Sequence, residues 1–146
     1  MPLFGRTCLA SLVALAELII ARIRFSSFHV SDLEVMNGRA MQAGRSVPAA
    51  APGDLARAAM VAALVPRIAY RLPWRSDCLI QAMAAQNWLS REGIAANISI
   101  GIDKSPEKGF EAHAWLTYGD LAVCGGDLGR YSVLLDGLTQ VNEKQP

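Results

Sequence analysis

The stretch 72–82 (LPWRSDCLIQA) constrains the fold of this chain most, because it has the pattern of a loop that turns into a helix. Pro73 disfavours helical backbone angles at the residue before it, so a preceding helix is expected to end there. Ser76 and Asp77 are both good helix N-cap residues, and apolar residues at helical spacing follow them. The pattern therefore predicts a helix that begins near Cys78 and ends before Gly93, a residue suited to a helix C-terminus.

A cysteine in the first turn of a helix is well placed to act as a nucleophile. The free backbone N–H groups and the positive end of the helix dipole favour a thiolate over a thiol at this position. The thiolate is the nucleophilic form, so Cys78 is the first candidate for a catalytic residue.

Composition limits the class of protein. A chain of 146 residues with 52% apolar residues predicts one folded domain with a sizeable core. The net charge of +1, with both signs interspersed, gives no basic patch for nucleic acid. The 3 cysteines are an odd number without a CxxC motif, which predicts no disulfide framework and a reducing, cytoplasmic compartment.

The N-terminal apolar run predicts a helix from Thr7 to Ile23. The run from residue 8 to 20 contains Glu17 and is shorter than the roughly 20 residues that a membrane-spanning helix needs. No small-x-small cleavage site of a signal peptide follows it. We expect this helix to be buried against the domain, with membrane-surface or partner docking as alternatives.

The segments before the cysteine read as helices and a linker. Asp32 is expected to cap a short helix, and Pro48 and Pro52 mark a linker over 46–53. A second helix is expected from Asp54 to about residue 72, kinked or divided at Pro66. The predicted organisation is an N-terminal helical segment and linker over 1–53, a core over 54–139 and a tail over 140–146.

The segments after the cysteine helix read as strands. Alternating apolar residues predict strands over 96–102 and 110–118, and Gly119 begins a turn into a return strand over 121–124. A short strand is expected over 131–135. His113 lies in the middle of the second strand, on the same face as Trp115.

An acyl-transfer site needs a base beside its thiolate. A hairpin packed on the cysteine helix would bring His113 against Cys78 and meet this requirement. Spacing alone also allows a buried cysteine and a hydrogen-bonded core histidine. A metal site of Cys78, His113 and Cys124 lacks paired-ligand spacing, so neither a metal nor another cofactor is expected. Cys8 and Cys124 have the pattern of small buried residues, and His29 that of a surface or capping residue.

Four motifs together resemble the lasso-peptide leader peptidases, the B2 or C-terminal B-protein members of a transglutaminase-like cysteine protease superfamily. The motifs are the run 71–79 (RLPWRSDCL), Gly93-Ile94, Ile100-Gly101-Ile102 and the run 112–116 (AHAWL), and the resemblance covers residues 56–134. It implies an α+β fold with a papain-like or transglutaminase-like core. In that core a cysteine-bearing helix packs on a small antiparallel sheet that carries the histidine, with additional N-terminal helices.

The resemblance implies a function, cleavage of the leader segment from a ribosomally synthesised precursor peptide. Cys78 would attack the scissile carbonyl, with its own backbone N–H as one oxyanion donor, and His113 would act as base and then acid. The implied partners are the precursor peptide, a separate small leader-recognition protein and a cyclase.

The chain departs from the family pattern at the third catalytic position. The family has Asp or Glu about twelve residues after the histidine, where this chain has Gly125. Asp127 is the nearest carboxylate, and a shift of two residues keeps it on the same side of a strand, although it can equally be a turn residue. We therefore expect Asp127 to orient His113. The alternatives are a catalytically impaired scaffold or leader-binding subunit, and an acyltransferase that joins an amine instead of water.

Overall fold

The computed structural model describes residues 3–43, 52–103, 111–126, 129 and 131–136. Within them, four helices and one antiparallel sheet confirm the predicted α+β fold. The helices are α1 (Leu3–Phe25), α2 (Asp32–Ala43), α3 (Pro52–Ala69) and α4 (Cys78–Arg91). The strands are β1 (Asn97–Asp103), β2 (Ala112–Tyr118), β3 (Leu121–Cys124) and β4 (Tyr131–Asp136).

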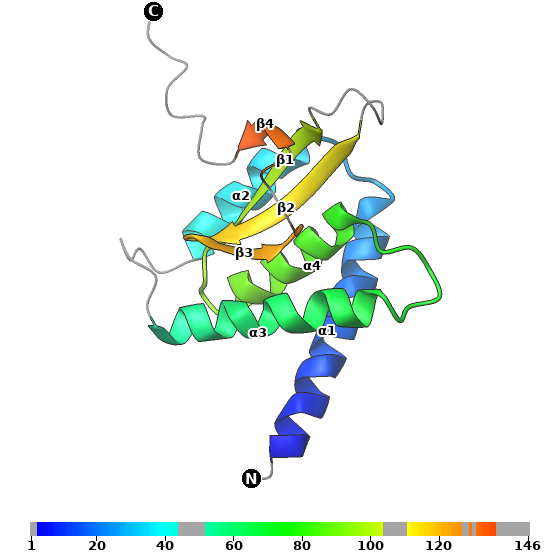
Figure 1. Ribbon diagram of the computed structural model, residues 1–146, viewed down its shortest axis with the longest axis vertical. Coiled ribbons are helices and arrows are strands. Elements are labelled where there is room, and N and C mark those ends of the chain that lie inside the picture. The colour runs from blue at the N-terminus through cyan, green and yellow to red at the C-terminus, as the bar shows by residue number, and fades with distance from the viewer. Residues whose placement is uncertain (1–2, 44–51, 104–110, 127–128, 130, 137–146) are drawn as a thin grey trace, which may run out of the picture.

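Helix α4 is the centre of the fold. It lies between the sheet and α3, and it contacts all three other helices and strands β1, β2 and β3 (Figure 1). Its residues are buried nearly all round, from Ile80 to Leu89. The helix ends at a C-cap where Gly93 takes a positive φ of 76° and donates to the Ser90 carbonyl, as the sequence predicts. Its N-terminal turn, with Cys78, reaches a surface cleft formed with α3 and the β2–β3 hairpin.

The four strands have the order β3-β2-β1-β4, all antiparallel. The predicted hairpin between β2 and β3 is confirmed, with Gly119 at φ 55° in the turn. Ile98 of β1 and Leu116 of β2 are paired and both fully buried in the core. Strand β4 pairs with β1, on the far side from β3, so residues 131–136 return across the sheet.

A buried asparagine joins α2 to the sheet. The side chain of Asn37 accepts from the Ile98 N–H at 2.9 Å and donates to the Ile98 carbonyl at 2.9 Å. Gln86 of α4 also donates to Asn37, at 2.8 Å. These bonds satisfy the main chain of Ile98 where β4 does not pair with it, so α2, β1 and α4 are held together at one point.

Helix α1 packs against the domain as expected, but only one side of it is buried. Ala14, Leu18 and Ala21 belong to the core, whereas Leu9 is exposed, and in Figure 1 the N-terminal end of α1 extends beyond the other elements. The buried carboxylate of Glu17 accepts from Asn87 at 2.5 Å and pairs with Arg91, both on α4 or at its end. Among the described helices, none combines the length and the apolar character that crossing a membrane requires.

Some local predictions are wrong. Helix α3 begins at Pro52 rather than Asp54, since proline suits the first helical position, and it ends at Ala69. Pro66 does not divide it, because a proline three residues before the end removes only one helical hydrogen bond. Cys8 is exposed rather than buried. The linker residues 46–51 and the tail 140–146 lie outside the described residues, and the predicted division at residues 53 and 139 stays a prediction.

Candidate active site

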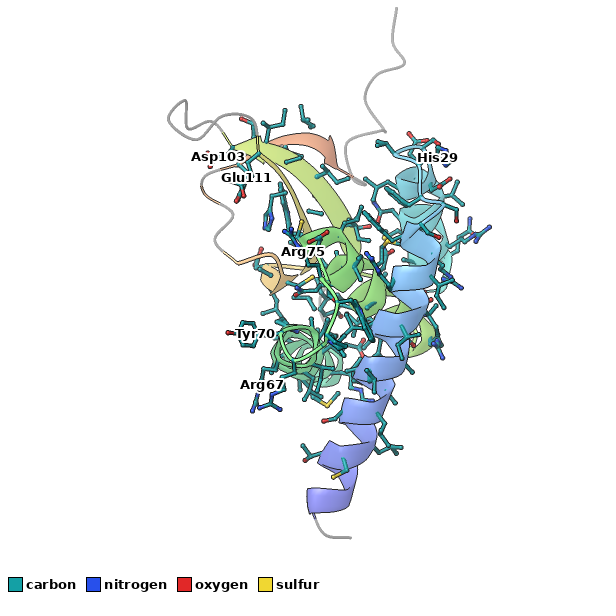
Figure 2. All side chains as sticks on the ribbon, turned by 90° about the vertical axis from the view of Figure 1, so that its right-hand side faces the viewer. His29, Arg67, Tyr70, Arg75, Asp103 and Glu111 are labelled. Carbon is teal, nitrogen blue, oxygen red and sulfur yellow. The ribbon has the colours of Figure 1, made fainter. Side chains whose placement is uncertain are left out.

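The helix that carries the cysteine begins where the sequence predicts, but not through a side-chain cap. Asp77 has the extended backbone of an N-cap residue, with φ −64° and ψ 167°, and its side chain makes no capping hydrogen bond. It pairs instead with Arg75 at 3.6 Å, and Figure 2 shows Arg75 beside this end of α4. Gln81 holds the loop from inside the helix by donating to the Ser76 carbonyl at 2.9 Å.

The sulfur of Cys78 lies at the edge of β2. The backbone N–H of Ala114 donates to Cys78 Sγ at 3.4 Å. Pairing between β2 and β3 stops at Leu116 and Cys124, so the sulfur takes an acceptor position that a continued β3 would occupy. The N–H of Ala114 and the start of α4 both direct partial positive charge at the sulfur, which suits a thiolate.

His113 precedes the residue that contacts the sulfur, and its ring nitrogen Nε2 lies 2.5 Å from the carbonyl oxygen of Gly125. A carbonyl oxygen can only accept, so this hydrogen bond requires the proton on Nε2. In the neutral imidazole the other nitrogen, Nδ1, then has the free lone pair and can act as a base. Gly125, twelve residues after the histidine, thus contacts the imidazole through its main-chain carbonyl and not through a carboxylate side chain.

Gly125 has no room for a side chain. Its φ of +115° lies in a region that residues with a Cβ rarely adopt. A Cβ at this position would lie 3.0 Å from Trp115 Cα and closer still to Trp115 Cβ. An acidic residue therefore cannot replace Gly125 without moving the chain that supplies the carbonyl.

Cys78, His113 and Gly125 line one cleft of about 520 Å³. Its walls come from the C-terminal half of α3, the first turn of α4 and the β2–β3 hairpin, with Pro66 and Gln81 among the lining residues. A volume of this size is in the usual range for ligand sites. The structure thus brings together two of the three predicted catalytic residues, Cys78 and His113.

Cys124 also lines the cleft but is chemically different from Cys78. Burial raises the pKa of the Cys124 thiol to about 12, so it stays protonated at neutral pH. All three cysteines are free, and Cys8 lies on the exposed part of α1. Among the described side chains, no group of three or more His, Cys, Asp and Glu could hold a metal ion.

The third predicted residue, Asp127, lies outside the described residues, so its role stays a prediction. His29 is a surface residue near Asp32, as the sequence indicates. Two participants were missed by sequence reasoning: the Gly125 carbonyl, which no side-chain pattern can reveal, and Tyr131, whose ring stacks on His113 with 4.6 Å between centroids. The sequence contained one sign of the Gly125 carbonyl: a glycine stands where the family pattern has an acidic residue.

Comparison with known proteins agrees with this arrangement at the level of a superfamily. A family model described as transglutaminase-like superfamily matches residues 30–136, which include α2 to β4 and the whole cleft. The comparison with curated proteins finds no match, and neither does the comparison with solved structures.

Proposed function

The chain belongs to the transglutaminase-like superfamily, and from that premise we propose that it is a cysteine peptidase that removes the leader segment from a lasso-type precursor peptide. The superfamily generally comprises cysteine-dependent enzymes with protease or acyltransferase-type activity. The observation that carries the proposal is the cleft in which the helix-terminal Cys78 and the hydrogen-bonded His113 lie together.

The geometry supports nucleophilic catalysis in two steps. His113 Nδ1 takes the proton of Cys78, and the thiolate attacks the scissile carbonyl carbon to form a tetrahedral intermediate. His113 then gives the proton to the leaving amine, and the acyl group remains on sulfur as a thioester. Water, activated by the same imidazole, attacks the thioester and releases the acid product and the free thiol. The Gly125 carbonyl keeps Nε2 protonated throughout.

The negative charge on the substrate oxygen needs hydrogen-bond donors. The backbone N–H of Cys78 is the first, because it lies at the N-terminus of α4. Within the described part of the chain, the indole Nε1 of Trp74 and the hydroxyl of Ser76 are buried without a hydrogen-bond partner. Both can donate and both belong to the loop before the nucleophile. They lie outside the lining of the cleft, so we propose them as second donors only for a substrate that extends to this loop.

The substrate class rests on the four motifs shared with the leader peptidases. Two of them now have a place in the site: the run 71–79 forms the loop and the start of α4, and the run 112–116 carries His113 on β2. The proposal includes a separate small leader-recognition protein and a cyclase as partners. Three free cysteines are compatible with a reducing compartment, and we propose the cytoplasm.

The experiment that tests this function is mass spectrometry of a precursor peptide, encoded beside the gene, after incubation with the protein and a primary amine. Hydrolysis gives two fragments whose masses add up to the peptide plus one water, and this is the expected result. A product with the amine joined to the peptide would identify an acyltransferase instead. No reaction, together with labelling of Cys78 by a thiol reagent no faster than that of the exposed Cys8, would identify an impaired scaffold.

Asp127→Asn decides whether the predicted carboxylate takes part. The sequence-based prediction that Asp127 orients His113 implies a loss of orders of magnitude in this variant. Because Nε2 of His113 already has an acceptor in the Gly125 carbonyl, we propose the opposite outcome, turnover within about threefold of the parent. Asp120→Asn, in the exposed β2–β3 turn, is the matched control. If steady-state kinetics of peptide cleavage show a loss of two or more orders of magnitude for Asp127→Asn alone, the carboxylate is the orienting group.

A further inference from the structure

The imidazole of His113 stacks with two aromatic rings, those of Tyr131 and Trp115. Its centroid lies 4.6 Å from that of Tyr131, with 25° between the ring planes, and 6.2 Å from that of Trp115. Tyr131 and Trp115 are themselves 6.1 Å apart. Distances of this kind are typical of favourable aromatic pairs. The catalytic base thus has a hydrogen bond in its plane and an aromatic ring on its face.

The stack of His113 on Tyr131 joins strands that are not neighbours. His113 is on β2 and Tyr131 is on β4, and β1 lies between them. Adjacent strands are about 4.8 Å apart, so β2 and β4 are separated by roughly 10 Å. Rings from the two strands can approach to stacking distance only if they lean toward each other over β1, where a side chain would obstruct them.

Gly101 is the residue of β1 that leaves this space. It pairs with His113 on one side and with Val133 of β4 on the other. A Cβ at Gly101 would lie 2.8 and 2.9 Å from ring carbons of Trp115, and 2.6 Å from the Ser132 carbonyl oxygen. The Ile-Gly-Ile motif therefore has a physical role, since its glycine leaves room for the Trp115 ring, which belongs to the same group of rings as His113 and Tyr131.

We propose that Tyr131 is a positioning residue of the catalytic site, which holds the imidazole of His113 in its reactive plane from the far side of β1. A single hydrogen bond from Nε2 leaves the ring free to rotate about that bond, and a stacked face removes this freedom. The electron-rich face of the phenol ring also favours the imidazolium that forms when Cys78 loses its proton. In this chain, a carbonyl and an aromatic face together do what an acidic side chain does alone.

The inference rests on the proposed function, and the test uses Tyr131→Leu, which removes the ring, and Tyr131→Phe, which keeps it. We expect Tyr131→Leu to lower kcat for peptide cleavage roughly tenfold with little change in KM, and Tyr131→Phe to stay within about twofold. Tyr70→Leu is the matched control, because Tyr70 is 92% exposed and projects from the end of α3 (Figure 2).

Two readouts do not depend on the peptide. The alkylation rate of Cys78 by iodoacetamide should fall about as much as kcat in Tyr131→Leu and stay near the parent rate in Tyr131→Phe. In proton NMR spectra, the ring signals of His113 should lie upfield in the parent and in Tyr131→Phe, and move downfield in Tyr131→Leu. The chain has 2 histidines, and the side chain of His29 is 80% exposed, so His29 serves as an internal reference.

The possible outcomes separate the two proposals. An alkylation rate and ring shifts that respond as expected, in a protein that cleaves no peptide, support the role of Tyr131 and reject the peptidase. Normal alkylation, normal kcat and unchanged ring shifts in a folded Tyr131→Leu protein overturn the role of Tyr131 and leave the peptidase intact. Equal damage from Tyr131→Phe and Tyr131→Leu also overturns it, because the hydroxyl rather than the ring would then be responsible.

Discussion

Cys78→Ala is expected to abolish peptide cleavage, with a loss of at least about 10⁴-fold, while the fold survives. The nucleophile is lost because alanine has no group that can form the thioester. The fold should survive because Cys78 is only half-buried and alanine is the best helix former. The lost contact from the Ala114 N–H to the sulfur should lower the free energy of unfolding by about 1 kcal/mol.

The measurement is the rate of peptide cleavage beside a urea unfolding curve for each variant. Cys8→Ala is the matched control, since Cys8 is exposed on α1 and outside the cleft. His113→Ala should cause nearly the same loss as Cys78→Ala. The double variant should be no slower than the single ones, because both residues are needed for the same catalytic step. Cleavage by folded Cys78→Ala protein would refute the nucleophile, and additive losses would refute the pair.

Gly125→Asp is expected to damage the protein, although it restores the acidic residue of the family pattern. Any side chain at this position meets a φ of +115° and lies against Trp115. Backbone strain and overpacking each cost about 1–3 kcal/mol, so the free energy of unfolding should fall by about 3 kcal/mol or more. Movement of the Gly125 carbonyl away from His113 should lower kcat about 100-fold in the protein that remains folded.

The unfolding midpoint in urea and kcat per folded molecule test this prediction. Gly125→Ala should cause a similar loss, because the obstruction begins at Cβ. Gly126→Ala is the matched control: its φ of +70° carries a strain of about 1 kcal/mol, but a Cβ there meets no atom within 4 Å. If the Gly125→Asp enzyme is stable and faster than the parent, an acidic side chain orients His113 better than the Gly125 carbonyl does, and the prediction is wrong.

The sequence was a good guide wherever the cause of a structure is local. The start of α4 at Cys78, its end at Gly93 and the β2–β3 hairpin at Gly119 depend on residues within a few positions of one another, and all three are confirmed. The side of β2 that carries His113 follows from strand alternation. Motif resemblance supplied the pairing of Cys78 with His113, which spacing alone left open.

Position within the helix decided what local pattern misjudged in α3, and packing decided it in α2. Pro66 was expected to kink or divide a helix and instead lies near the end of a continuous α3. Asn37 lies in an Asn-Gly pair that weakens a helix by propensity, yet α2 continues through it because the Asn37 side chain binds the main chain of Ile98. The contact spans 61 positions, so no window along the sequence contains its cause.

The sequence by itself determined which reactive groups the proposed site contains, because these groups are side chains: a thiol in the first turn of a helix and an imidazole on a strand. Only the tertiary structure decided how the imidazole is held. The Gly125 carbonyl belongs to the backbone, which is identical at every residue and leaves no mark in a sequence. Tyr131 reaches His113 because β4 pairs with β1 on the side away from β3, and strand order arises from long-range pairing, not from local pattern.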